Sequence, residues 1–340
     1  MKDLPKVSVI IPMRNEEKYI AKCLQSVIDQ DYPKEMVEIL VVDGISEDTS
    51  REIVTIFSQK YSNIRLIENP KMATTFGLNK GILESKGQVI VRIDAHSYIE
   101  PDYIRQCISA LEQTGADNVG GLMRPIGINF IGKTIALAMS SPFGIGSGRF
   151  HYAEKEMFVD TVYLGAYRRE VFNRIGMYDE ELHYSEDDEL NYRLIKSGGK
   201  IFLSPKIKSY YYCRSSLSSL WRQYYNYGYG KVRTLKKHKG LASCRHMVPP
   251  SFVLSIIGGL VLWIVNPIFG WLLLAILGSY FGLSVFTSAK ISFQKGWRYF
   301  LILPITFGVI HFSYGIGFLI GLLKVFKGES IARYEVSSLK

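Results

Sequence analysis

The sequence has few of the glycine-rich motifs that bind phosphates at the start of a helix. No Gly-x-Gly-x-x-Gly follows the first predicted strand, which disfavours a Rossmann dinucleotide site. We do not expect a P-loop either. A nucleotide held instead by carboxylates and a metal ion remains compatible with the sequence.

Cysteine is scarce, and the four cysteines are scattered. They are Cys23, Cys107, Cys213 and Cys244, with no close pair among them. Neither a disulfide framework nor a cysteine-based metal site is expected from this spacing. Buried thiols of this kind suit a reducing cytosol. The first residues, MKDLPKVSVI, do not predict a signal peptide, because their short apolar run continues into a folded pattern.

Charge is nearly missing from residues 248–326, which contain no Asp or Glu. Three apolar stretches lie there, at 248–265, 268–288 and 299–326, each close to the ~20 residues that cross a bilayer. Asn266-Pro267 is a turn signal between the first two stretches. We therefore expect a soluble domain over residues 1–240, a membrane domain with about three apolar helices over 241–330, and a short tail over 327–340.

Positive charge exceeds negative charge, with 41 Lys and Arg against 31 Asp and Glu. Much of the excess lies in Lys231–His246, just before the first apolar stretch, and more lies between the second and third. Lysines beside a membrane segment mark its cytosolic side. Three full spans would place the basic C-terminal tail outside, so either the tail tolerates its charge or one stretch is re-entrant or interfacial. A short apolar helix over Phe130–Met139 is expected on the membrane surface.

The first half of the chain alternates predicted strands and helices, which is typical of an α/β fold with a mostly parallel sheet. Strands are predicted over Val7–Pro12, Glu38–Asp43 and Val89–Asp94. Ser46 is a candidate cap for the helix that follows the second strand. Pro12, Asp43 and Asp94 each end their strand. Because ligands bind beyond the carboxyl ends of such strands, these three residues predict a shared site.

Several segments in the right order resemble a family 2 glycosyltransferase of the inverting, GT-A-fold type. They are VSVIIPMRNEEKYIAKCLQSVIDQDYP, EILVVDGISEDTSREIV, GLNKGILESKGQVIVRIDAHSYIEPDYI, FVDTVYLGAYRREVFNRIGMYDEEL and YSEDDELNYRLIKSGGKIF. The resemblance covers roughly Lys6 to Lys239. With Asp-Ala-His and apolar spans after the catalytic part, the chain is similar to bacterial exopolysaccharide glycosyltransferases of the succinoglycan type.

The resemblance implies that Asp94 contacts a metal ion or the donor diphosphate, because it matches the first Asp of the family's Asp-x-Asp motif. His96 stands where the second Asp is usual, so it is a candidate metal ligand. Imidazole suits Mn²⁺ better than Mg²⁺, which favours Mn²⁺ as the divalent cation. The alternative is a histidine that only hydrogen-bonds at a strand end.

Further donor contacts follow from the same resemblance. Asp43 matches the Asp that accepts a hydrogen bond from the nucleotide base, or else it stabilises the turn before Gly44. Pro12 and Glu16 would line the nucleotide pocket, with Glu16 alternatively a first-turn carboxylate of a helix. Gly165 lies in the segment that closes on the donor sugar.

Asp187 is the candidate general base. It lies in SEDDELNYRL, where the family pattern Glu-Asp-x-x-Leu places the base, with Leu190 and Arg193 in register. An inverting transfer needs one base for the acceptor hydroxyl, and neighbouring carboxylates raise its pKa. The alternative is a charged helix N-terminus without a catalytic role.

The segment Leu220–Thr234 lies where processive members carry Gln-x-x-Arg-Trp. Gln223 is present, but Arg-Trp is not, which argues against a chain-extruding synthase. Gln223, Lys231 and Arg233 are candidate contacts for the donor diphosphate or an acceptor phosphate. Such an aromatic and basic segment can also bind single-stranded nucleic acid, but the adjacent spans argue against a nucleic-acid partner.

These observations predict a multi-pass enzyme of the cell membrane whose catalytic domain faces the cytoplasm. It would transfer one sugar, with inversion, from a nucleotide-sugar donor such as a UDP-hexose to a lipid-linked acceptor such as polyprenyl diphosphate oligosaccharide. Two alternatives stay open: transfer to polyprenyl monophosphate itself, and a non-catalytic, membrane-tethered scaffold that binds nucleotide sugars. Oligomeric state is not predicted.

Overall fold

The computed structural model describes residues 4–146, 148–182, 184–238 and 244–327, and it divides into two compact units. The first unit comprises Met1–Arg124 and Arg149–Tyr212, and the second comprises Pro125–Gly148 and Cys213–Lys340. This division does not follow the predicted boundary at residue 240. The short apolar helix α5 (Phe130–Met139) and the aromatic and basic helix α9 (Leu217–Lys237) pack with the apolar helices.

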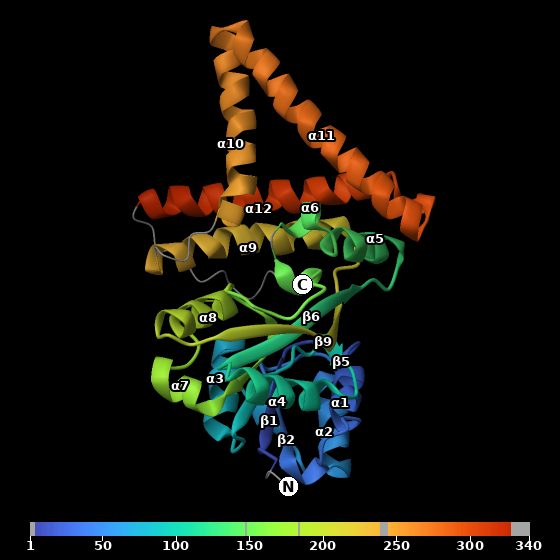
Figure 1. Cartoon of the computed structure of the whole chain (residues 1–340), viewed down its shortest axis with the longest axis vertical. Helices are drawn as coiled ribbons and strands as arrows, with labels where there is room; N and C mark the ends of the chain where they lie inside the picture. Colours follow the sequence, from blue (N-terminus) through green and yellow to red (C-terminus); the bar gives the residue numbers. More distant parts are fainter. Residues whose placement is uncertain (1–3, 147, 183, 239–243, 328–340) are drawn as a thin grey trace. The chain divides into compact units, whose positions relative to one another are not determined.

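The first unit is built on one mixed sheet with helices on both faces (Figure 1). Its strands are β1 (Val7–Met13), β2 (Val37–Asp43), β3 (Ile64–Glu68), β4 (Val89–Arg92), β5 (Ser97–Ile99), β6 (Asn118–Ile126), β7 (Met157–Phe158), β8 (Tyr163–Arg168) and β9 (Ile201–Tyr212). Its helices are α1 (Ile20–Ile28), α2 (Ser50–Lys60), α3 (Thr74–Glu84), α4 (Tyr103–Thr114), α7 (Arg169–Ile175) and α8 (Glu186–Lys196), with 3-10 turns η1 (Lys34–Met36) and η2 (Arg149–His151).

The strand order is β3-β2-β1-β4-β8-β6-β9-β5, with β7 also paired to β9. The four strands β3, β2, β1 and β4 are parallel, as the alternating pattern predicts. From β8 onward the pairing is antiparallel. The predicted α/β fold is therefore confirmed, but the sheet is mixed rather than mostly parallel. Helices also connect most of these later strands, for example α7 and α8 between β8 and β9, but they do not form the repeated crossovers of a parallel sheet.

Successive side chains of each buried strand point to opposite faces of the sheet, so a hydrophobic core lies on each face. In β1, Val9 and Ile11 pack with residues of α1, α2 and α4, whereas Ile10 packs with residues of α3, α7 and α8. Cys23 and Cys107 are buried in the first of these cores, as predicted. The two helical layers hold the sheet so that its parallel strands end at one edge.

The second unit is helical. It contains α5 (Phe130–Met139), α6 (Pro142–Ile145), α9 (Leu217–Lys237), α10 (Cys244–Val265), α11 (Pro267–Lys295), η4 (Trp297–Tyr299) and α12 (Ile302–Phe326). Three of these helices, over His246–Val265, Pro267–Lys295 and Ile302–Phe326, are long and apolar enough to cross a membrane. The Asn266 side chain accepts a hydrogen bond from the backbone N–H of Ile268 (2.9 Å) and starts α11, which confirms the predicted turn.

One detail of the apolar region differs from the prediction. The basic loop expected after residue 288 is mostly helical, because α11 continues to Lys295. The predicted tail over 327–340 lies, except for Lys327, outside the described residues, as do residues 239–243 of the basic segment.

Candidate active site

A buried arginine at the end of β4 binds three carboxylates. The guanidinium of Arg92 donates from Nε to Asp94 (3.0 Å), from Nη1 to Asp187 (2.6 Å) and from Nη2 to Glu186 (3.1 Å). The planar fork of arginine allows one residue to hold several oxygens at fixed positions. Arg92 thus joins the strand end that carries Asp94 to the helix that carries the predicted base.

Sequence analysis did not single out Arg92. The available signal was a cation inside the otherwise apolar run that forms β4. Because burying an unpaired charge is costly, such a residue predicts partners of opposite charge elsewhere in the chain. The sequence does not reveal which of the chain's carboxylates those partners are.

The position of Asp187 follows from the packing of α8, whose second residue it is. Leu190 and Leu194 anchor the helix in the core. Asn191 is fully buried, and its side chain hydrogen-bonds to Asn118 (3.0 Å) and Thr161 (3.0 Å). A buried polar network of this kind favours one orientation of the helix, although Oδ1 of Asn118 has no hydrogen-bond partner among the described residues. The first turn of α8 is thereby held against Arg92.

Two of the three acidic residues in the cluster, Asp187 and Asp94, differ in proton affinity. Burial raises the pKa of Asp187 to about 7, with Glu186, Asp94 and Asp188 adding to the rise and Arg92 opposing it. Burial alone would raise the pKa of Asp94 too, but Arg92 and His96 outweigh it, and the net shift is downward. Asp187 can therefore exchange a proton near neutral pH, whereas Asp94 stays ionised.

His96 is held by Glu16. The Nδ1 atom of His96 lies 2.8 Å from Oε1 of Glu16, and the imidazole packs edge-on against Tyr211. A carboxylate only accepts, so Nδ1 carries the hydrogen and the lone pair of the neutral ring is on Nε2. Glu16 itself is positioned by its backbone N–H, which donates to Ser50 (2.7 Å). Carboxylate-supported histidines of this kind are common among metal ligands.

The donor set fits a divalent cation that also binds phosphate oxygens and water. Within the described ranges, no group of three or more His, Cys, Asp or Glu side chains is arranged to enclose a metal ion. Asp94 and His96 supply two ligands of suitable chemistry. Two protein ligands suffice where substrate phosphates and water complete the coordination. Asp94 and His96 are thus the residues that would hold such an ion.

Asp43 ends β2 and is fully buried. Its carboxylate accepts hydrogen bonds from Ser46 Oγ (2.5 Å) and Arg51 Nη1 (3.1 Å). Ser46 was predicted as a helix cap, but α2 begins at Ser50, and Ser46 instead closes the turn that Asp43 begins. The backbone N–H of Ser46 also lies 3.2 Å and 3.3 Å from the two carboxylate oxygens. These contacts account for the roughly four acceptor positions of an ionised carboxylate, so a contact with a nucleotide base remains a prediction. Pro12 is the residue before the last one of β1. It pairs with Val42, which directly precedes Asp43 in β2.

Arg14 is a further candidate that sequence analysis missed. It directly follows β1, and its Nε and Nη1 atoms are buried with no hydrogen-bond partner among the described residues. An unpaired guanidinium at the carboxyl edge of the sheet suits an anionic group of a ligand.

Gly165 has a local structural role. A Cβ at this position in β8 would lie 2.6 Å from the Asn118 side chain and 2.6 Å from the Tyr167 ring. Any larger residue would displace the network that positions α8. Gln223, Lys231 and Arg233 lie on α9 in the second unit, and their role in donor binding remains a prediction, as does that of Gly165.

One segment contradicts the expectation that no P-loop pattern occurs. Gly127–Thr134, GINFIGKT, has the P-loop spacing between β6 and α5. The structure does not form a phosphate loop there, because α5 already begins at Phe130 and the Asn129 side chain caps the N–H of Gly132 (2.7 Å). The Thr134 hydroxyl is buried against the carbonyl of Phe130 (2.9 Å). The backbone N–H groups that would hold phosphate are used within the helix.

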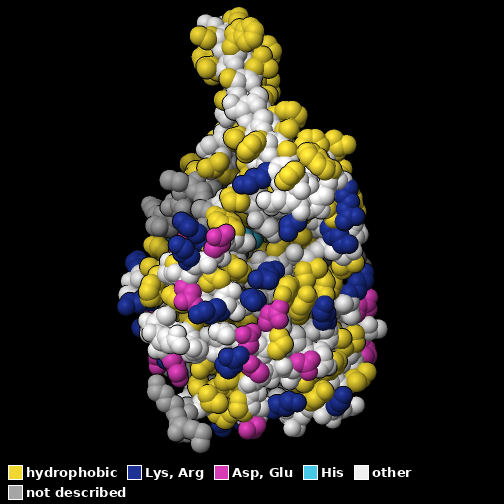
Figure 2. All heavy atoms as spheres, turned by 45° about the vertical axis from the view of Figure 1, so that its right-hand side comes forward, with side chains coloured by type: hydrophobic (Ala, Val, Ile, Leu, Met, Phe, Trp, Pro, Cys, Tyr) yellow, Lys and Arg dark blue, Asp and Glu magenta, His cyan; other side chains and the backbone are white. Residues whose placement is uncertain are grey.

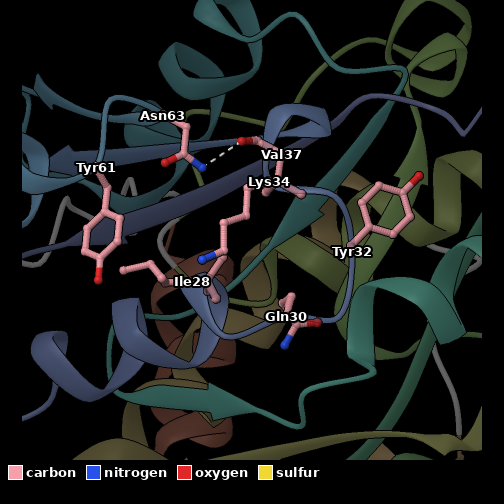
Figure 3. A pocket seen from close by; sticks show the side chains of 8 residues that line it. Ile28, Gln30, Tyr32, Lys34, Val37, Tyr61 and Asn63 are labelled. Carbon is pink, nitrogen blue, oxygen red and sulfur yellow. Dashed lines mark hydrogen bonds between the residues drawn. The ribbon is translucent and has the colours of Figure 1, made fainter.

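A small pocket in the first unit lies away from these residues (Figure 3). It has a volume of about 20 Å³ and is bordered by Val37, Tyr61 and Asn63, whose side chain donates to the Val37 carbonyl (2.9 Å). This volume holds about one water molecule. Val37 is the first residue of β2 and Asp43 the last, so the pocket is at the opposite end of the strand from the candidate site.

A mixed α/β sheet with Asp43 at the end of β2, Asp94 two residues beyond β4 and a base candidate beside Arg92 is typical of glycosyltransferases of the GT-A class. Comparison with known proteins agrees. The family model for glycosyl transferase family 2 matches residues 8–176. The chain is 30% identical over 326 residues, covering 94% of this chain and 97% of the other, to a dolichyl N-acetyl-alpha-D-glucosaminyl phosphate 3-beta-D-2,3-diacetamido-2,3-dideoxy-beta-D-glucuronosyltransferase of Methanococcus voltae. The protein belongs to glycosyl transferase family 2 and is a glycosyltransferase.

Other similar proteins support the same class. The succinoglycan biosynthesis protein ExoA of Rhizobium meliloti (strain 1021) is 30% identical over 260 residues, covering 76% of this chain and 78% of that protein. The fold resembles a mannosyltransferase of Pyrobaculum calidifontis solved with GDP-Man and Mn²⁺, at a TM-score of 0.59 and 17% identity over 97% of this chain and 89% of the other. The predicted GT-A fold and the predicted resemblance are confirmed.

Proposed function

We propose that this glycosyltransferase transfers a single sugar, with inversion, from a nucleotide-sugar donor to a lipid-linked acceptor at the cytoplasmic face of a membrane. The expected donor is a UDP-hexose, and the expected acceptor is polyprenyl diphosphate oligosaccharide. The observation that carries the proposal is the Arg92 cluster, in which one buried cation binds both Asp94 and Asp187. A contact for the leaving diphosphate and a base for the acceptor are the two groups that the reaction needs.

In the proposed step, Asp187 accepts the proton of an acceptor hydroxyl while that oxygen forms a bond to the anomeric carbon. The bond from this carbon to the diphosphate breaks on the opposite face, and the nucleoside diphosphate leaves with the electron pair. Arg14 and Arg92 would supply fixed positive charge near the leaving group. Pro12, Asp43 and Gly165 would orient the nucleotide and sugar, and Gln223, Lys231 and Arg233 would contact phosphate.

Asp94 and His96 would hold a divalent cation, with Glu16 orienting the imidazole. When bound, such a cation supplies charge neutralisation for the departing diphosphate. A histidine ligand favours Mn²⁺ over Mg²⁺. The Mn²⁺ in the mannosyltransferase of Pyrobaculum calidifontis is compatible with this assignment.

We expect the wild type to prefer Mn²⁺ over Mg²⁺ and His96→Ala to lose this preference. The measurement is Mn²⁺ binding in the presence of UDP, followed by electron paramagnetic resonance, together with activity in each ion. His151→Ala is the control, because His151 lies in η2, a segment that contains no proposed metal ligand. Equal binding of both ions by the wild type, unchanged in His96→Ala, would show that His96 is not a ligand.

The pKa of Asp187 predicts the pH dependence of transfer. As the pH falls through about 7, Asp187 takes up a proton and cannot accept another. The value of kcat/KM should therefore fall roughly tenfold for each pH unit well below this midpoint. A profile that stays flat down to pH 5 would rule out a base with this pKa.

The acceptor proposal draws on the relatives. The Methanococcus voltae enzyme is named for an acceptor in which a sugar is carried on dolichyl phosphate. This supports a lipid-linked saccharide over polyprenyl monophosphate itself. Membership in the family supports catalysis over the predicted alternative of a silent scaffold.

The direct test is a screen of nucleotide sugars with lipid extracts as the acceptor source and Mn²⁺ present. We expect nucleoside diphosphate release that depends on both the lipid and one particular sugar, with a product one sugar longer than the lipid-linked acceptor. A product in which the sugar is joined directly to polyprenyl monophosphate would support the alternative acceptor. Donor binding without turnover under every condition would contradict the proposal.

A further inference from the structure

The third apolar helix is packed differently from the first two. Large hydrophobic side chains are exposed at ten described positions on α10 and nine on α11, but at only three on α12. Figure 2 shows hydrophobic side chains covering the end of the α10–α11 hairpin at which the two helices meet. A helix that crosses a bilayer on its own exposes apolar side chains to lipid along its length. The small number of exposed hydrophobic side chains therefore distinguishes α12 from α10 and α11, which form a hairpin.

The C-terminal half of α12 packs along α9 (Figure 1). Gly317 and Gly321 form the contact: a methyl group at Gly317 would clash with the Tyr225 carbonyl, and one at Gly321 would lie 3.1 Å from the Tyr229 carbonyl. Ser313 continues this face and is fully buried. Ser313, Gly317 and Gly321, at four-residue spacing, thus form a small-residue face on α12, and Gly317 and Gly321 meet α9 rather than another apolar helix.

The N-terminal half of α12 packs on α5 and α6. Phe307 meets Phe143 edge to face at 4.9 Å. His311 lies 3.0 Å from the Phe143 carbonyl through Nε2 and 2.8 Å from the Tyr280 hydroxyl through Nδ1. Because a carbonyl only accepts, Nε2 carries the hydrogen and Tyr280 donates to Nδ1. The middle of α12 thus contacts α6, the short apolar helix that follows α5 in the sequence.

The partner helix α9 is too charged for the bilayer interior. Its 21 residues include five cations: Arg222, Lys231, Arg233, Lys236 and Lys237. A cation at the centre of a membrane is energetically costly. If α12 crossed the hydrocarbon region, α9 would have to enter it as well. In the headgroup layer, the exposed cations Arg222, Lys236 and Lys237 would instead be attracted to anionic lipids.

The α10–α11 hairpin has the dimensions and the aromatic residues of a membrane crossing. Its 29-residue α11 is about 43 Å long at 1.5 Å per residue, which exceeds the ~30 Å hydrocarbon core. Trp263 and Trp271 flank the turn at one end, and Trp297 follows Lys295 at the other. Tryptophan is enriched at both surfaces of a bilayer.

We infer that only α10 and α11 cross the membrane, as a hairpin, and that α12 lies in the headgroup layer with α9 and α5. The bound partner of this helical layer is a bilayer surface that carries anionic lipids. An even number of crossings returns the chain to the side of the catalytic unit. Lys324 and Lys327 then lie on the same side as Lys236 and Lys237, which agrees with the positive-inside rule.

The first test places single reporter cysteines in the full chain, in intact cells, and labels them with a membrane-impermeant maleimide. Leu83→Cys marks α3 of the catalytic unit, Ile264→Cys marks the hairpin turn, and Lys340→Cys marks the C-terminus; Leu83 and Ile264 are 69% and 88% exposed. Unsubstituted protein gives the background of the native thiols. We expect positions 83 and 340 to share one accessibility and position 264 to have the opposite one. Position 340 labelling with position 264 would overturn the inference.

The second test measures the depth of α12 in vesicles that contain anionic phospholipid. Spin labels at Ile305, Ile316 and Leu323 lie near one helix face, because 18 residues make five turns. An interfacial helix gives three similar, shallow depths, whereas a spanning helix places the central label deepest. The inference does not depend on donor or acceptor identity: an inactive protein with this topology would leave it intact and would count only against the proposed function.

Discussion

Asp187→Asn should lower kcat by about 10²–10⁴-fold, the contribution of a positioned general base, and leave donor binding within about twofold. The amide keeps the shape of the side chain but cannot accept the acceptor proton. Arg92 still has Asp94 and Glu186 as partners, so the fold and the diphosphate contact persist. Steady-state kinetics, with calorimetric binding of the nucleoside diphosphate, separate the two effects.

Asp188→Asn is the matched control for this result. It removes the same charge from the same turn of α8 without touching the Arg92 nitrogen that binds Asp187. Its kcat should remain within about fivefold of the wild type. A fully active Asp187→Asn enzyme, or an Asp188→Asn enzyme that is equally impaired, would refute the assignment of Asp187 as the base.

Arg92→Ala should destabilise the fold by about 3–5 kcal/mol at pH 7, because removing one member of a buried ion cluster leaves the others without a counter-charge. Asp94, Glu186 and Asp187 would then lie close together as uncompensated carboxylates. Activity should be lost as well, because both proposed reacting groups are held by this guanidinium. Urea denaturation of the detergent-solubilised protein measures the change.

The pH dependence of this destabilisation follows from the carboxylates. Arg92 holds the pKa of Asp94 below its usual range. The ion pair of Arg92 with ionised Asp94 therefore stabilises the fold at pH values above that range, and this stabilisation is lost as the pH falls through the lowered pKa. The difference between Arg92→Ala and wild type should therefore shrink toward pH 4. Arg105→Ala is the control, because Arg105 pairs with Asp31 at the exposed surface, where an ion pair contributes little to stability. Equal destabilisation by the two variants at pH 7 would contradict the role of Arg92.

The sequence predicted the parallel half of the sheet because each of its strands is a β-branched run followed by a helical period. The antiparallel half was harder to predict from the sequence, because β8 and β9 are joined by local turns and by α7 and α8 rather than by a repeating unit. The resemblance to a family located Asp94 and Asp187, but not Arg92 between them. A pairing across 95 positions depends on how α8 packs against the sheet, which single-sequence patterns do not encode.

The predictions for the side chains of Ser46 and His96 had different outcomes, because the two side chains have different neighbours. Ser46 suits a helix cap by residue type, yet the neighbouring Asp43 carboxylate competes for its hydroxyl. His96 was predicted as a possible ligand, and the structure adds the Glu16 carboxylate that fixes its tautomer. The apolar stretches were located correctly by composition, but composition cannot tell a crossing helix from one that packs on α9. That difference lies in tertiary contacts such as those of Gly317 and Gly321.

The most direct test of the account is the anomeric configuration of the lipid-linked product. With the donor sugar identified by the screen, nuclear magnetic resonance of the product would report the new glycosidic bond. An α-linked donor should give a β-linked sugar on the lipid-linked acceptor, and Asp187→Asn should give none. A product that retains the α configuration would contradict the single-base mechanism on which the account depends.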